Sequence, residues 1–289
     1  MTKITQFAVS TLSAIALSAM AVSAAGAASL EDIKKAGVIR IAVANEIPYG
    51  YVDPAGKALG AGPDVAKKLM ETLGIGKIEW VTTNFSSLIP GLKADRFDMV
   101  AAEMAILPDR CKQVLFSEPN TSYGEGLLVA AGNPKDIHTY KDFASNPKLK
   151  VAIMAGADQL EMMQKLGVPD ANVVTIASNA DAISTVGTGR ADAYAATSLT
   201  ASGLAEQGKS VEVAAKFTDP VIDGKAVRSW GGFTFASGNE ELRDAVNGAL
   251  AEFKKTPEWS EIVTGYGFTE ADVEGSKATN TAALCGGSA

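Results

Sequence analysis

The feature that most constrains this chain is an alternation of β-rich runs with helical patterns, which occurs twice along the sequence. In the first round, strand and helix patterns alternate over residues 38–44, 63–73, 78–81, 86–95 and 99–102. In the second, they alternate over residues 150–154, 159–166, 173–176, 180–186 and 191–196. This alternation is typical of parallel sheets whose strands are connected through helices. The sequence therefore predicts an α/β fold with two similarly built lobes.

Two extended stretches at the ends of the second round predict how the lobes are joined. Residues 126–134 and 231–239 are glycine-containing apolar runs that end in turn signals. If both cross between the lobes, the chain leaves the first lobe and later returns to it, and helices within residues 241–266 complete that lobe. We predict a cleft between two lobes with the following bounds: residues 29–130 plus 232–289 for the first lobe, and 131–231 for the second.

The first 28 residues have the pattern of a secretory signal peptide. Lys3 is followed by an apolar run over residues 7–22 and then by small residues around Ala27. A transmembrane anchor is the alternative, but serine and threonine interrupt the run, which is shorter than the about 20 residues that a span needs. We expect cleavage near Ala27 and a periplasmic location for the mature protein.

The charge balance and the scarcity of histidine and cysteine exclude several classes of function. The 289 residues include 26 Lys and Arg against 33 Asp and Glu, a net charge of −7 that disfavours binding to nucleic acid. One histidine, His138, and two cysteines are too few for a zinc site built on several such ligands, and they leave no His-based triad away from His138. We expect no metal, no cofactor and no nucleic-acid partner.

The two cysteines, Cys111 and Cys285, can pair if the protein is exported to an oxidising compartment. The alternative is two unrelated thiols. A bridge would tie the C-terminal tail to the part of the fold that holds Cys111.

Several motifs resemble one family closely. The runs SSLIPGLKADRFDM at residues 86–99, LPDR at 107–110 and FSEP at 116–119 resemble the amino-acid class (family 3) of periplasmic solute-binding proteins of ABC importers. Within that class, NEIPYGY at residues 45–51, together with Cys111 and Cys285, is most similar to the subgroup that binds ectoine and hydroxyectoine. The resemblance implies a two-lobe Venus-flytrap fold with two hinge strands, which closes on a ligand in the cleft.

The resemblance also implies roles for residues of the first lobe. The carboxylate-binding arginine of the family falls on Arg110, and a planar guanidinium suits that role because it can hold both carboxylate oxygens. Glu46 is the acid that the ectoine-binding subgroup carries, where it can neutralise an amidinium. Tyr49 and Phe85 offer π faces to such a cation, unless they are packing residues. Trp230 is either a further aromatic wall or a core residue.

In the second lobe, Gly156 and Ala157 belong to the loop that meets the ligand carboxylate through backbone N–H groups in this family, and the neighbouring Asp158 can instead be a plain N-cap. Thr197 stands near the place where amino-acid binders carry an aspartate for the α-ammonium group.

Two departures from the family pattern leave the ligand open. Ala105 replaces the threonine or aromatic residue that is common there, and Glu103 replaces a small residue. Glu103 either adds a second acid to the cleft or points into solvent.

The function that we expect is capture of a small zwitterion of the ectoine type and its delivery to a membrane permease of an ABC importer, by a monomeric protein that is not an enzyme. A polar or basic amino acid or a proline-like osmolyte is the alternative ligand. A lyase on the same fold and the sensing module of a receptor are the alternative functions.

Overall fold

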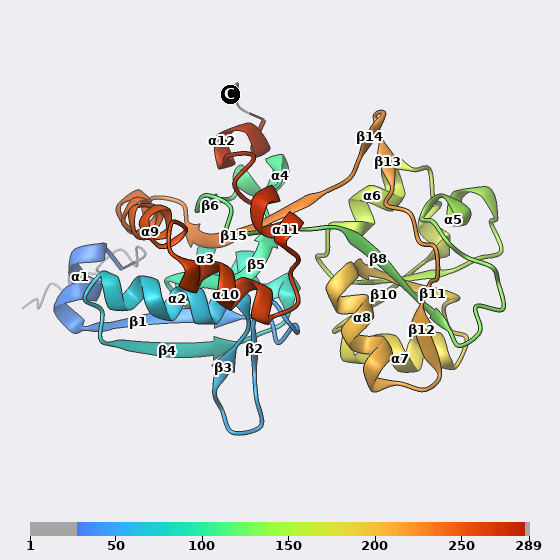
Figure 1. Cartoon of the computed structure of the whole chain (residues 1–289), viewed down its shortest axis with the longest axis horizontal. Coiled ribbons are helices and arrows are strands. Elements are labelled where there is room, and N and C mark those ends of the chain that lie inside the picture. The colour runs from blue at the N-terminus through green and yellow to red at the C-terminus, as the bar shows by residue number, and fades with distance from the viewer. Residues whose placement is uncertain (1–27, 287–289) are drawn as a thin grey trace, which may run out of the picture.

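The structure is a computed structural model that describes residues 28–286. It contains two main β-sheets, and the chain crosses twice between them (Figure 1). This confirms the predicted α/β architecture with two lobes. The predicted cleavage site near Ala27 and all but the last residue of the predicted signal peptide, residues 1–28, lie outside the described residues.

The first sheet consists of six strands: β1 (Val38–Val43), β4 (Lys77–Thr82), β5 (Met99–Ala105), β6 (Val114–Phe116), β7 (Thr121–Tyr123) and β15 (Ser229–Ala236). Their order is β4-β1-β5-β15-β6, and β7 also pairs with β15. Strand β1 runs parallel to β4 and β5, whereas β15 runs antiparallel to β5, β6 and β7. A small hairpin, β2 (Tyr51–Val52) with β3 (Ala58–Leu59), projects from this lobe (Figure 1).

The second sheet consists of five strands: β8 (Glu125–Ala130), β9 (Val151–Met154), β10 (Val173–Ile176), β11 (Ala193–Thr197) and β12 (Val211–Val213). Their order is β10-β9-β11-β8-β12. Strand β9 is parallel to β10 and β11, and β8 is antiparallel to β11 and β12. A second hairpin, β13 (Val221–Ile222) with β14 (Lys225–Ala226), precedes the return to the first lobe.

Helices cover both faces of each sheet. The first lobe carries α1 (Leu30–Ala36), α2 (Ala61–Thr72), the 3-10 turn η1 (Phe85–Ser87), α3 (Leu88–Lys93), α4 (Pro108–Cys111), α9 (Glu240–Phe253), α10 (Pro257–Gly265), α11 (Glu270–Gly275) and α12 (Thr281–Leu284). The second carries α5 (Lys141–Ser145), α6 (Gln159–Lys165), the 3-10 turn η2 (Asp170–Asn172), α7 (Ala180–Gly187) and α8 (Ser198–Gln207). In the part of the chain that the structure describes, no helix has both the length and the apolar character that a bilayer span requires.

Each sheet has a hydrophobic core on both faces. In the first lobe, Leu69 of α2 and Val246 of α9 pack on one face, and Leu92 of α3 packs on the other. In the second, Met163 of α6 and Leu204 of α8 pack on opposite faces. These apolar positions are spaced for helix faces, so the burial pattern follows directly from the sequence.

The chain changes sheets a few residues before each of the predicted lobe boundaries. Strand β8 begins at Glu125 and belongs to the second sheet, whereas the sequence assigned residues up to 130 to the first lobe. Strand β15 begins at Ser229 and pairs with β7 in the first sheet, three residues before the expected return at 232. We propose crossings near residues 124 and 228, because there the chain changes sheets.

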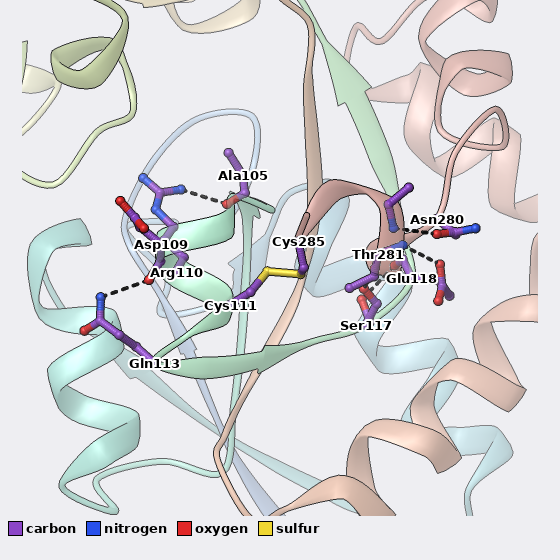
Figure 2. The surroundings of a disulfide bond; sticks show 11 residues. Ala105, Asp109, Arg110, Cys111, Gln113, Ser117, Glu118, Asn280, Thr281 and Cys285 are labelled. Carbon is purple, nitrogen blue, oxygen red and sulfur yellow. Dashed lines mark hydrogen bonds between the residues drawn. A yellow bond between two sulfur atoms is a disulfide. The ribbon is translucent and has the colours of Figure 1, made fainter. Parts of the chain in front are cut away.

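Cys111 and Cys285 form a disulfide with their Cα atoms 5.7 Å apart, although 174 residues separate them in sequence (Figure 2). This confirms the predicted bridge over the alternative of two separate thiols. The bond ties the end of α12 to the end of α4 in the first lobe.

Candidate functional site

A cavity lies between the two lobes. Its volume is about 380 Å³ when the space open to solvent is counted. The first lobe lines it with Glu46, Tyr49, Phe85, Ala102, Glu103, Ala105 and Tyr123, and the second with Met154, Ala157, Asp158, Gln159, Tyr194, Ala196 and Thr197. Both lobes therefore contribute residues to one cavity.

Glu46 brings a buried carboxylate to this cavity. It follows β1 at a bend where Asn45 has a positive φ of 55°. Its Oε1 accepts hydrogen bonds from Asn179 Nδ2 at 3.0 Å and from Thr200 Oγ1 at 3.4 Å, both in the second lobe. Burial raises the pKa of Glu46 to about 7, although these donors oppose the rise. A cation in the cavity would stabilise the charged form.

Aromatic rings form much of the cavity wall. Tyr49 and Tyr123 meet edge to face with ring centroids 5.2 Å apart, a favourable geometry for aromatic pairs. The Tyr49 hydroxyl donates to Thr197 Oγ1 at 2.7 Å and so joins the lobes. Thr197 also caps α8, because its side chain accepts a hydrogen bond from the Thr200 backbone N–H.

Glu103 lies in the cavity wall and is only 2% exposed, so the alternative that it points into solvent is wrong. Its Oε1 accepts from Asn120 Nδ2 and its Oε2 from Thr121 Oγ1, both at 2.7 Å. Burial raises the pKa of Glu103 to about 7 against the effect of these donors.

Two further acids lie beside this wall. Asp158 lines the cavity, and the buried Glu125 accepts a hydrogen bond at 2.7 Å from Gln159, another lining residue. Burial first, and then the charge of Asp158, raise the pKa of Glu125 to about 8. Among the described residues that line the cavity there are three acidic side chains and no Lys, Arg or His. The site is therefore electrostatically suited to a ligand that carries positive charge.

Arg110 lies at the rim of the cavity rather than among its lining residues. Its guanidinium stacks over Phe85, with 5.6 Å from Cζ to the ring centroid. Nη1 donates to Ala105 O at 3.0 Å, and Nη2 donates across the cleft to Gly156 O at 2.9 Å. Figure 2 shows the side chain extending from α4 toward Ala105. The guanidinium thus sits where it can meet a ligand group at the cavity mouth.

The other predicted site residues divide into two groups. Ala105 and Ala157 line the cavity, and Gly156 lies next to it, where a Cβ atom would come within 3.0 Å of Ser86 Cα. Trp230 does not line the cavity, because its indole Nε1 donates to Gly275 O at 2.9 Å toward α11, which agrees with the packing alternative.

Asp158 occupies the N-cap position of α6, but its side chain makes no capping hydrogen bond. Its Oδ2 instead accepts from Ser229 Oγ at 3.2 Å. The interpretation of Asp158 as a plain N-cap is therefore wrong, since the carboxylate faces the cavity and the returning strand β15.

Sequence reasoning missed several lining residues, among them Tyr123, Met154, Gln159 and Tyr194. They come from four different elements and share no motif, so only the tertiary fold brings them together. The described residues contain no group of three or more His, Cys, Asp or Glu side chains arranged to hold a metal ion.

Comparisons with known proteins identify the family of this chain. A "Probable amino-acid ABC transporter periplasmic-binding protein y4tE" from Sinorhizobium fredii (strain NBRC 101917 / NGR234) is 55% identical over 90% of this chain and 87% of its own length. The crystal structure of EhuB in complex with hydroxyectoine matches with a TM-score of 0.80 at 32% identity, over 89% of this chain and 97% of that one. An ancestral arginine-binding protein bound to arginine matches with a TM-score of 0.69 at 27% identity, over 80% and 99%.

These relatives are binding proteins rather than enzymes, which supports the expected binder over a lyase. The family model for bacterial extracellular solute-binding proteins of family 3 matches residues 39–270. The chain therefore belongs to the family 3 bacterial extracellular solute-binding proteins.

Proposed function

We propose that this protein captures a small zwitterion with a delocalised cation, of the ectoine or hydroxyectoine type, and delivers it to the permease of an ABC importer. The observation that carries the proposal is the buried Glu46 carboxylate in a cavity walled by aromatic rings, with Arg110 at its mouth. An amidinium is a flat cation, so it can pair with Glu46 while its faces contact Tyr49 and Phe85. The carboxylate of the same ligand is left for Arg110.

Closure follows from contacts that span the lobes. Glu46 accepts from Asn179, Tyr49 donates to Thr197, and Arg110 donates to Gly156. A ligand that adds bonds to both lobes shifts the population toward this closed form. Release then requires these contacts to break, which a docked permease can favour by binding the open form more tightly.

A basic amino acid is the second candidate, and a specific observation favours it. Glu103 and Asp158 add two acids to the same cavity, more than one amidinium needs. The structural similarity to an arginine-binding protein bound to arginine agrees with this candidate. A polar amino acid or a proline-like osmolyte does not use the additional acids, so it is the weaker alternative.

We propose that the protein acts in the periplasm, as the name of its 55% identical relative indicates for that protein, and that it acts as a monomer. The predicted signal peptide at residues 1–28 agrees with this location.

Isothermal titration calorimetry with ectoine, hydroxyectoine, L-arginine, L-glutamine and L-proline tests the ligand assignment. We expect ectoine or hydroxyectoine to bind most tightly, and Glu46→Gln to weaken that binding by about 2–5 kcal/mol, because a buried charge pair loses one partner. Thr200→Val is the matched control, since it removes one donor at 3.4 Å but keeps the carboxylate. Tighter binding of L-arginine would favour the second candidate, and an equal loss of affinity for a neutral ligand would show that Glu46 is structural.

A further inference from the structure

The C-terminal strap, residues 280–285, crosses the first lobe toward the segment that carries Arg110 (Figure 2). Its first turn is held at two points. Thr281 Oγ1 donates to Ser117 O at 2.5 Å, and the Thr281 backbone N–H donates to Glu118 Oε2 at 3.0 Å. The strap is therefore docked on the loop after β6 before it reaches α4.

The other end of the strap is joined covalently to α4. Cys285 forms the disulfide with Cys111, the residue after Arg110. Cys111, Cys285 and Leu284 pack against one hydrophobic cluster, and so does Phe85, the ring over which the Arg110 guanidinium stacks. The disulfide and the support of Arg110 thus share one packed region.

Helix α4 has little anchorage of its own. It is four residues long, and none of its residues is buried. An isolated turn of this length is unstable, because helix nucleation costs more than a single turn recovers. The backbone N–H groups of Arg110 and Cys111 both donate to Leu107 O, at 3.0 and 2.9 Å, which are contacts within the same short segment.

We propose that the C-terminal strap, acting through the Cys111–Cys285 bond, positions Arg110 at the rim of the ligand cavity. The guanidinium reaches Ala105 O and Gly156 O from a helix that the strap holds in place. Cys285 is thus a positioning residue for ligand binding, in a segment beyond residues 39–270 that the family model matches. The inference rests on the proposed role of Arg110 in binding the ligand.

Hydrogen exchange of the ligand-free protein tests the tether directly. In the double variant Cys111→Ala/Cys285→Ala, we expect the amides of residues 110–113 to exchange about tenfold faster. Ile33→Ala is the matched control, because it creates a cavity under α1 in the same lobe without touching α4. Unchanged exchange at residues 110–113, or an equal change in the Ile33→Ala variant, would overturn the inference.

A second variant covers the case in which the double variant does not fold. Thr281→Val keeps the disulfide but loses the hydrogen bond to Ser117 O. We expect it to speed exchange at residues 110–113 by a smaller factor than removal of the disulfide. No change at these residues in a folded Thr281→Val variant, measured alongside a double variant that fails to fold, would count against the strap.

A double-mutant cycle with ectoine separates positioning from general stability. Removal of the disulfide should raise the Kd about tenfold when Arg110 is present and leave it unchanged in an Arg110→Ala background. Equal increases in both backgrounds would show that the bond acts only on overall stability. An Arg110→Ala variant with unchanged Kd would overturn the proposed role of Arg110. If Arg110→Ala raises the Kd but removal of the disulfide does not, only the role of the strap is overturned.

Discussion

At the scale of single residues, the Thr197 hydroxyl has two structural roles. It joins the two lobes through Tyr49, and it caps helix α8. The Tyr49 ring is 2% exposed, and its hydroxyl donates to Thr197 Oγ1 from the opposite lobe. The same oxygen caps α8 through the Thr200 backbone N–H. Loss of the Thr197 oxygen would therefore leave two groups without this partner: the buried Tyr49 hydroxyl and the Thr200 N–H at the start of α8.

We predict that Thr197→Val destabilises the closed protein by about 2–4 kcal/mol, because it removes the N-cap of α8 and leaves the buried Tyr49 hydroxyl without its hydrogen-bond partner. Thr197→Ser should keep most of the stability, since it retains the oxygen. Tyr49→Phe removes the bond between the lobes but leaves the cap, so it should cost less than Thr197→Val. Urea unfolding of the three variants checks this order, and a Thr197→Val variant as stable as the serine variant would contradict it.

Sequence reasoning predicted several of the residues that line the cavity but not its full surface. The resemblance placed Glu46, Tyr49 and Phe85 in the cleft, and all three line the cavity. It did not predict that Tyr194 lines the cavity or that the Asp158 carboxylate accepts a hydrogen bond from Ser229. The positions of these two side chains depend on how separate elements pack and not on a local pattern.

At the scale of elements, α2 lies unusually close to β5, the strand that carries Glu103. At Gly62, in the first turn of α2, a Cβ atom would lie 2.7 Å from Ala101 O and 3.2 Å from Glu103 Oε1. Glycine is therefore required here by close packing and not by a special backbone conformation. Gly248 in the middle of α9 offers the opposite case, because nothing lies within 4 Å of the position of its Cβ atom.

We predict that Gly62→Ala lowers the free energy of unfolding by about 1–3 kcal/mol, because a methyl group forces the helix away from the sheet. Gly248→Ala should raise it by about 0.4–1 kcal/mol, because alanine restricts the unfolded chain and fits the helix. Chemical denaturation of both variants measures this difference in sign. A stabilised Gly62→Ala variant would show that α2 can shift without cost.

Strands and helices with clear apolar patterns were predicted well, including the four-residue strand β10, whereas a helix with a weak pattern was missed. Helices were expected within residues 241–266, and α9 spans Glu240–Phe253, because its apolar spacing covers several turns. Helix α8 was missed, since its sequence SLTASGLAEQ is rich in small and hydroxyl residues that favour helices weakly. Its cap and its packing on the second sheet stabilise it, which are tertiary effects that local propensity does not contain.

At the scale of the whole molecule, the Glu46 carboxylate is buried where the two lobes meet, in the arrangement that we propose is the closed form. Glu46 in the closed form meets Asn179 and Thr200 as donors, Asp158 as a like charge and Arg110 as an opposite one. Burial outweighs the donors and raises its pKa to about 7, whereas water in an open cleft returns it toward its ordinary value of about 4.3. The closed form therefore binds a proton that the open form has lost at intermediate pH.

We predict that raising the pH from about 5.5 to 8.5 opens the ligand-free protein, because the closed form must then hold an ionised Glu46. The shift is on the order of 2–3 kcal/mol in favour of the open form, from about 1.4 kcal/mol per unit of pKa difference. Small-angle X-ray scattering should record a larger radius of gyration at the higher pH, and a cationic ligand should reverse the change. Glu46→Gln should show a weaker response, because its amide does not titrate. An equal expansion of the Glu46→Gln variant would assign the pH response to Glu103 or Glu125 instead, both of which have raised pKa values beside the same cavity.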